Sequence, residues 1–321
     1  MARPSRRRRQ EVSSGGAPAP GRRAPTRAAS SPTPSRYRTQ RVNIPRPWWQ
    51  SPWAWGGGIT VVVVAVLVVF VVLANQPAKG TSSSSTNQPV PASVLAAVTG
   101  VSPQVSTTIA AGGLANPLEP VTGSPAALTG PGGEPQLFYF GAEYCPYCAA
   151  QRWSVVIALS RFGTFSNLHI TMSDSTADDY PDTHTFTFYG STYSSSYLDF
   201  APVENADRSD NPLQAPTTAQ QALIATYDVA PYSSQDSGIP FMDLANRYII
   251  SGTAINPQLL QGMTWQQIAA TLSDAQNQVA EQIIGNANWL TAGICKVTDG
   301  EPGSVCGSAP ISTLESQLTS S

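Results

Sequence analysis

The chain of 321 residues contains few cysteines, few histidines and, beyond its first 50 positions, few basic residues. Four cysteines are too few for a miniprotein held together by a dense set of disulfides. The two histidines, His169 and His184, lack the paired spacing of a zinc site. No nucleotide-, phosphate- or haem-binding motif occurs, so we expect no cofactor.

Charge is distributed very unevenly along the chain. Residues 1–50 hold 12 arginines and one acid, Glu11, a balance of +11, whereas the remaining 271 residues hold six basic and 19 acidic residues, a balance of −13. The basic segment is rich in proline, arginine and serine and has almost no apolar periodicity, which excludes a folded DNA-binding domain there. The acidic remainder argues against nucleic acid as a partner of the folded part.

An uncharged, valine-rich run occupies residues 56–74. As an α-helix it would extend about 28 Å, close to the hydrocarbon thickness of a bilayer. Four tryptophans precede it, as expected for an interfacial aromatic belt: Trp48, Trp49, Trp53 and Trp55. A cleaved signal peptide is the alternative, but it would require shorter basic and apolar regions. The run therefore predicts one uncleaved transmembrane helix.

The position of the arginines predicts the orientation of this helix. By the positive-inside rule the N-terminus is cytoplasmic and the chain after the helix is extracytoplasmic. We therefore expect a single-pass membrane protein with a disordered basic tail (1–55), a transmembrane helix (56–74), a flexible linker (75–90) and an extracytoplasmic domain with an N-terminal extension (91–321). The arginine-rich tail is interpreted as a topological signal that touches anionic lipid, with nucleic-acid binding as the alternative.

The clearest chemical signal is Cys145-Pro146-Tyr147-Cys148. Residues 136–140 form an apolar, aromatic run that predicts a buried strand, and a helical stretch follows the motif. Cys145 therefore lies at a helix start, where unpaired N–H groups and the helix dipole stabilise a thiolate. The thiolate is the attacking species in thiol–disulfide exchange. Cys148, one turn later, can form or resolve a disulfide with Cys145.

The same spacing also occurs in zinc sites and in inert structural disulfides. A zinc site would need further ligands, and Cys295 and Cys306 lie in a Gly/Pro-rich segment far along the chain. A second feature favours redox chemistry: Ile239-Pro240 precedes a predicted hairpin over residues 241–252. An X-Pro bond can be cis at modest cost, although a trans proline that begins a strand is the alternative.

These residues resemble a known superfamily. The segment from Phe140 to Cys148, Phe-Gly-Ala-Glu-Tyr-Cys-Pro-Tyr-Cys, resembles the active-site segment of thioredoxin-fold proteins, and its tetrapeptide is similar to that of glutaredoxins. Gly238-Ile239-Pro240 resembles the cis-proline loop of the same superfamily. The resemblance implies an α/β, thioredoxin-like fold with a central mixed sheet and flanking helices. It also implies that Cys145 is the nucleophile, Cys148 the resolving cysteine and Pro240 the substrate-loop proline.

Residues 90–310 also resemble a narrower group, the uncharacterised thioredoxin-like family called domain of unknown function nine-twenty-nine. Three segments carry this resemblance: residues 141–150, 159–165 and 180–190. The sequence departs from thioredoxins at Tyr139, six residues before Cys145, where the resemblance would place a buried aspartate that accepts a proton. The departure weakens a reductase assignment more than an oxidase or isomerase one.

Further patterns describe the rest of the domain. Residues 168–172 and 186–188 alternate as strands do, and the acidic stretch between them, 173–183, is interpreted as a solvated loop rather than a calcium site. Thr217 to Tyr227 begins with a capping pattern. Apolar residues from Trp265 to Ile283 recur at intervals of three and four, which predicts one long amphipathic helix.

Two further expectations concern the cysteines and Glu143. Outside the cytoplasm Cys295 and Cys306 are expected to form a disulfide, as a structural staple rather than an electron shuttle. Glu143, just before the redox motif, is expected on an exposed turn.

These patterns predict a membrane-anchored, extracytoplasmic thiol–disulfide oxidoreductase that acts on protein thiols or disulfides. A non-enzymatic binding or assembly module on the membrane exterior is the alternative, and a copper- or zinc-handling protein is a third.

Overall fold

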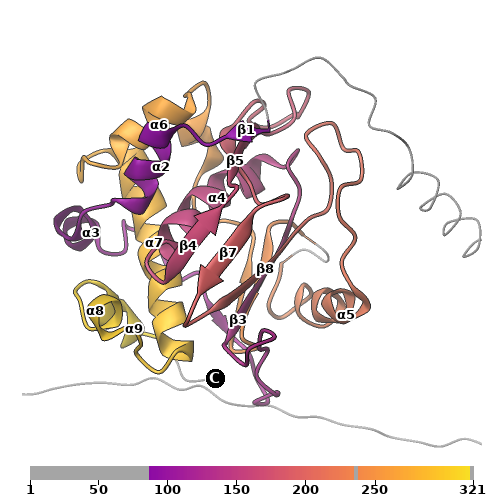
Figure 1. Ribbon diagram of the computed structural model, residues 1–321, viewed down its shortest axis with the longest axis vertical. Coiled ribbons are helices and arrows are strands. Elements are labelled where there is room, and N and C mark those ends of the chain that lie inside the picture. The colour runs from indigo at the N-terminus through magenta and orange to yellow at the C-terminus, as the bar shows by residue number, and fades with distance from the viewer. Residues whose placement is uncertain (1–86, 235–237, 319–321) are drawn as a thin grey trace, which may run out of the picture. The chain divides into compact units, whose positions relative to one another are not determined.

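The computed structural model describes residues 87–234 and 238–318 (Figure 1). The predicted cytoplasmic tail and the predicted transmembrane helix at 56–74 lie outside these residues. Among the helices that are described, none is both long and apolar enough to span a membrane.

The described residues form a mixed α/β domain, which confirms the expected class. Its helices are α2 (Ala92–Thr99), α3 (Pro103–Ile109), α4 (Pro146–Leu159), α5 (Thr218–Tyr227), the 3-10 helix η2 (Pro257–Leu260), α6 (Trp265–Thr271), α7 (Gln278–Val297), α8 (Gly303–Cys306) and α9 (Ile311–Glu315). Its strands are β1 (Gln88–Pro89), β2 (Glu119–Pro120), β3 (Gln136–Gly141), β4 (Gly163–Ser166), β5 (His169–Met172), β6 (His184–Thr187), β7 (Thr192–Ser195), β8 (Asp199–Glu204), β9 (Phe241–Leu244) and β10 (Tyr248–Ser251).

The central sheet has five strands in the order β2-β10-β9-β3-β8. β3 and β8 are parallel, and the other neighbours in this sheet are antiparallel. The predicted strand at 136–140 and the predicted hairpin at 241–252 are both confirmed, as β3 and as β9–β10. Strands β1, β5 and β6 form a second sheet, and β4 pairs with β7. The mixed sheet thus has β3 next to both a parallel and an antiparallel partner.

Alternation along β3 separates the two faces of the central sheet. Leu137 and Tyr139 belong to the larger apolar cluster, which includes residues of α4 and α7. Phe138 belongs to a smaller cluster, against which residues of α5 pack. Because successive side chains of a strand point to opposite faces, α4 and α7 cover one face and α5 the other. Figure 1 shows α7 and α5 on opposite sides of β3.

Helix α4 is enclosed on almost all sides. Every residue from Pro146 to Leu159 is buried except Tyr147. The reason is that α4 packs against the central sheet on one side and against α7, α2 and β6 on others. The helix that carries the cysteines is therefore held rigidly by its surroundings.

The prediction of one long helix from Trp265 to Ile283 is wrong. The structure has two helices, because α6 ends at Thr271 and α7 begins at Gln278. Asn277 caps α7 by accepting the N–H of Val279 at 2.9 Å. An N-cap residue has non-helical dihedral angles, so Asn277 begins a new helix even though the spacing of the apolar residues continues across it.

The segment before β3 wraps onto the domain. Gln88–Pro89 pairs with β5, so the last residues of the predicted linker belong to the fold. Helix α2 packs on α6 and α4, and α3 packs on α7. After α3 the chain passes very close to α7: a Cβ on Gly285 would lie 2.4 Å from the carbonyl oxygen of Ala111. Glycine is therefore required at this position for the extension to dock on α7.

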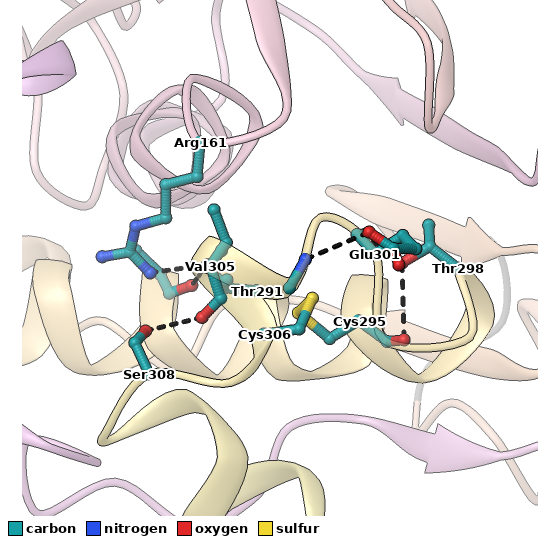
Figure 2. Close-up of a disulfide and its surroundings, with 10 residues drawn as sticks. Arg161, Thr291, Cys295, Thr298, Glu301, Val305, Cys306 and Ser308 are labelled. Atoms are coloured by element: carbon teal, nitrogen blue, oxygen red, sulfur yellow. Dashed lines mark hydrogen bonds between the residues drawn. A yellow bond between two sulfur atoms is a disulfide. The ribbon is translucent and has the colours of Figure 1, made fainter.

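A disulfide joins Cys295 in α7 to Cys306 at the end of α8, as expected (Figure 2). Both cysteines are buried, with exposed fractions of 0% and 3%. One turn before Cys295, Thr291 accepts a hydrogen bond from Arg161 at 2.6 Å. The Cys295–Cys306 disulfide thus fastens the C-terminal helices to α7. Because both sulfurs are buried, a structural role is favoured over the relay of electrons.

Removal of this disulfide should destabilise the domain. Its cysteines are 11 positions apart, and closing a loop of that size in the unfolded chain is worth about 3 kcal/mol. We expect the C295A/C306A variant to lose about that much free energy of unfolding in urea under non-reducing conditions. An unchanged midpoint would show that the bond does not hold α8 and α9 to α7.

A buried carboxyl group in β9 should make stability depend on pH. Asp243 accepts the N–H of Asn246 at 2.8 Å through Oδ1, while Oδ2 has no hydrogen-bond partner among the described residues. Burial raises the pKa of Asp243 to about 7. In the unfolded chain an aspartate has a pKa of about 3.9, so the folded state binds the proton more tightly.

Between these two pKa values the unfolded state ionises first, and the free energy of unfolding falls as the pH rises, by up to about 1.4 kcal/mol per pH unit. We expect Asp243→Asn to remove this slope, so that its stability relative to the wild type increases from pH 4 to pH 7 and then levels off. Urea unfolding at several pH values measures this. Parallel stability curves for the two proteins would contradict it.

Candidate functional site

Cys145 is the N-cap residue of α4. Its φ and ψ of −78° and 121° are extended, and its sulfur accepts the backbone N–H of Cys148 at 3.3 Å. Pro146 occupies the first turn, where its missing N–H leaves no helical bond unmade. The strand–motif–helix arrangement predicted from the sequence is confirmed. It places one sulfur among the free N–H groups at the helix start, a position that stabilises a thiolate.

The loop before β9 faces this sulfur. Cys145 Sγ lies 3.7 Å from the carbonyl oxygen of Ile239, and the Ile239–Pro240 peptide bond is cis. Pro240 is buried directly before β9. The structure therefore brings together the three residues predicted for the site, although 94 positions separate Cys145 from Ile239. Cys295 and Cys306 form the separate disulfide between α7 and α8.

The two thiols differ in accessibility and in acidity. Cys145 is 6% exposed and Cys148 is fully buried, and no bond joins them in the structure. The Cys148 thiol as a hydrogen-bond donor, the backbone N–H of Cys148 and the Arg152 charge lower the pKa of Cys145, although burial opposes them. Burial raises the pKa of Cys148 well above its usual range. Cys145 is thus the thiol of the pair that ionises more readily, and burial keeps Cys148 the weaker acid.

A buried ion pair lies next to the cysteines, and sequence reasoning missed it. Arg152 on α4 and Glu204 at the end of β8 are both fully buried. Two hydrogen bonds join them: Nε to Oε1 at 2.9 Å and Nη2 to Oε2 at 2.6 Å. Such a bidentate contact fixes the orientation of both side chains.

The ion pair also reaches the turn that carries Cys145. Arg152 Nη2 donates to the carbonyl oxygen of Ala142 at 2.7 Å, and the N–H of Cys145 reaches the same oxygen at 3.4 Å. One signal was present in the sequence, since an arginine four residues after Cys148 on a helix lies on the same face. Glu204 gave no such local signal, because its proximity depends on the parallel pairing that sets it opposite Gly141.

Tyr139 occupies the position where the resemblance to thioredoxins would place an aspartate. Its side chain is fully buried, and its hydroxyl has no hydrogen-bond partner among the described residues. A Cβ on Gly141 would lie 2.5 Å from that hydroxyl, so glycine leaves the room that the ring needs. Burial raises the pKa of Tyr139 well above its usual range. Tyr139 therefore stays neutral and does not serve as a base for Cys148.

Glu143 is not on an exposed turn, as the sequence suggested, but half-buried. Its backbone N–H donates to Ala206 at 2.9 Å, and its carboxylate accepts the Thr171 hydroxyl at 3.2 Å. These contacts exist because the end of β8 and strand β5 close over the turn. Burial raises the pKa of Glu143, a change that hydrogen bonds from threonines oppose.

A cavity of about 360 Å³ lies beside Cys145 and Cys148 and is lined by Tyr147, Gly238, Ile239 and residues of β10 and the following turn. Tyr147, between the two cysteines, is 40% exposed. A larger cavity of about 640 Å³ is lined by Glu134 before β3 and Lys296 near the end of α7. Cys145, Cys148 and Pro240 line neither cavity, but the smaller one includes Tyr147, between the two cysteines, and Ile239, which contacts Cys145.

In the part of the chain that the structure describes, no three His, Cys, Asp or Glu side chains are arranged to bind a metal ion. In the acidic loop predicted over 173–183, Asp174 accepts hydrogen bonds from Thr176, and Asp182 pairs with Arg208.

The asymmetry of the thiols should appear in their alkylation. Because its pKa is lowered, we expect Cys145 to react with iodoacetamide at pH values where an ordinary thiol is protonated, and to lose reactivity only as the pH falls below its own pKa. In the C148S and C145S variants, mass spectrometry of the modified peptide measures each sulfur alone. Equal rates, or faster alkylation of Cys148, would contradict this asymmetry.

Comparison with known proteins gives the context for this site. No curated protein and no solved structure matches the chain. Residues 120–296, more than half of the chain, match the family described as Domain of unknown function (DUF929). The match includes Cys145, Cys148 and Pro240, and it confirms the narrower resemblance seen in the sequence. The chain therefore belongs to the DUF929 family.

Proposed function

We propose that this protein is a membrane-anchored, extracytoplasmic thiol–disulfide oxidoreductase with Cys145 and Cys148 as its redox pair. One observation carries the proposal: Cys145 caps α4, accepts the N–H of Cys148 and directly contacts the carbonyl oxygen of Ile239 at 3.7 Å, beside a cavity that Tyr147 and Ile239 line. A low-pKa sulfur with a buried partner one turn away is the arrangement that disulfide exchange requires.

The topology supports a thioredoxin-like fold for this site. Strand β3, helix α4 and the parallel strand β8 form a β-α-β unit, and a Cys-X-X-Cys motif in such a unit is typical of thioredoxin-like redox proteins. Strands β4 to β7 are inserted between α4 and β8. Pro240 then follows α5 and leads into the antiparallel β9, which returns the chain to the sulfur of Cys145.

The chemistry follows from the different states of the two thiols. The Cys145 thiolate attacks one sulfur of a client disulfide, a mixed disulfide forms, and the first client thiolate leaves and takes a proton from solvent. Cys148 then attacks Cys145, its proton passes to the departing second client thiolate, and the protein disulfide forms. The client is reduced by two electrons and the Cys145/Cys148 pair is oxidised by two. In the reverse direction the protein disulfide oxidises a client dithiol.

The sequence outside the described residues supports the location. The uncharged run at 56–74 and the arginines before it favour a cytoplasmic N-terminus and an exterior domain. On the exterior, the Cys295–Cys306 disulfide is stable in an oxidising environment, and Cys145 meets proteins whose disulfides must form or be rearranged.

Trapping of the mixed disulfide tests the proposal. In C148S the resolving sulfur is absent, so we expect Cys145 to accumulate covalent adducts with client proteins. These adducts should appear on non-reducing gels and disappear with dithiothreitol. The wild type should also reduce insulin, because Cys148 then completes the reaction. C145S is the matched control and should form no adducts.

The proposal would be contradicted if C148S formed no adducts and the wild type also failed to reduce insulin. A Cys145/Cys148 disulfide that resists reduction as a structural one does would instead favour the binding or assembly module.

A further inference from the structure

The guanidinium of Arg152 is a buried positive charge whose Nη1 amino group, with its two N–H bonds, has no hydrogen-bond partner among the described residues. Its Nε and Nη2 bind Glu204 and the carbonyl of Ala142. A buried donor without a partner is costly, so a nearby anion would be strongly favoured. The groups close by that can become anions include the two cysteine sulfurs.

The charged and titratable groups around the cysteines come from three places. Arg152 and Tyr147 lie on α4, Glu204 ends β8, and Tyr139, Glu143 and Tyr144 belong to β3 and the turn after it. Tyr139 stays neutral, so it adds no charge. The Arg152 charge favours ionisation of both cysteines, although at Cys148 burial outweighs it and the pKa is raised overall. Glu204 carries the opposite charge and lies against the guanidinium, so it reduces the field of Arg152 at the sulfurs.

We propose that Arg152, balanced by Glu204, is a positioning residue that stabilises the thiolate of the reduced Cys145/Cys148 pair and thereby makes the pair a stronger oxidant. The inference rests on the proposed disulfide exchange at this site. Whatever stabilises the reduced, anionic form shifts the equilibrium away from the protein disulfide. Tyr139 occupies the position where the resemblance to thioredoxins would place a proton-accepting acid, so it does not assist the thiols by proton transfer. The positive charge of Arg152 favours the thiolate instead.

The chemistry of the step can be written in full. The protein disulfide accepts two electrons from two glutathione thiols, which become oxidised glutathione. The S–S bond between Cys145 and Cys148 breaks, Cys145 is left as a thiolate, Cys148 takes one proton, and the other proton passes to solvent. The thiolate is the species that faces the field of Arg152, because it forms only in the reduced protein.

The experiment compares variants with opposite electrostatic effects. R152M removes the positive charge, so at a fixed glutathione ratio we expect the ratio of disulfide to dithiol protein to rise about tenfold, equivalent to about 30 mV for a two-electron couple. E204Q removes the negative charge but keeps hydrogen-bonding atoms, and should shift the equilibrium toward the reduced form. The Cys145 pKa, measured by thiolate absorbance as a function of pH, should rise in R152M and fall in E204Q.

R161M is the matched control. Arg161 is also largely buried, but it donates to Thr291, Asn288 and Ser106 and not to a carboxylate. Its removal should lower stability without moving the redox equilibrium by more than about twofold. If R152M does not fold, the double variant R152M/E204L removes both charges from the buried site, and it should hold more of the disulfide form than E204Q does, because E204Q keeps the Arg152 charge; an equal or smaller disulfide fraction would overturn the inference.

Shifts of R152M and E204Q in the same direction, or no shift in either, would overturn the inference. In both cases the wild type would still exchange with glutathione, so the proposed function would stand. A wild type that does not exchange at all would instead contradict the proposed function.

Discussion

The buried ion pair between Arg152 and Glu204 connects the parts of the molecule that make the site. It joins α4 to the end of β8 and, through the carbonyl of Ala142, to the turn before Cys145. Removing one partner of such a pair typically costs about 3–5 kcal/mol, because the other charge is left buried. Replacing both by apolar side chains is often neutral or stabilising, so stability alone does not require these charges. The effect of the Arg152 and Glu204 charges on the neighbouring sulfurs accounts for their presence in the core.

The geometry around Cys145 follows from the parallel pairing of β3 and β8. The carboxyl ends of both strands meet at one edge of the sheet, where Gly141 lies opposite Glu204. Helix α4 begins at this edge, so its free N–H groups, the cysteines and the ion pair all gather there. The antiparallel β9 begins beside the carboxyl end of β3, with Phe241 opposite Phe140, and this brings Ile239 to Cys145.

The sequence predicted the features that depend on neighbouring residues. The aromatic run of β3, the helix after Cys145, the β9–β10 hairpin and the Thr217/Gln220 capping box all have signals within a few positions. Features that depend on distant parts of the chain were missed. The burial of Glu143 requires the end of β8 and strand β5, and the partner of Arg152 lies 52 positions away.

The break between α6 and α7 shows a different limit. Apolar spacing continues through the break because both helices face the same core, and the decisive signal was a single capping residue, Asn277. Periodicity reports which side chains are buried, while caps report where a helix begins. A capping asparagine within an apolar stripe is therefore evidence for two helices.

The reduction potential of the wild-type Cys145/Cys148 pair tests the central claim most directly. Structural disulfides of secreted proteins typically have potentials below about −300 mV, whereas catalytic ones have higher values. If the pair is redox-active and stabilised as a thiolate by the helix start and Arg152, its potential in glutathione buffers should lie well above about −300 mV. A value at or below that limit would show that Cys145 and Cys148 form an inert structural bond, and would contradict disulfide exchange at this site.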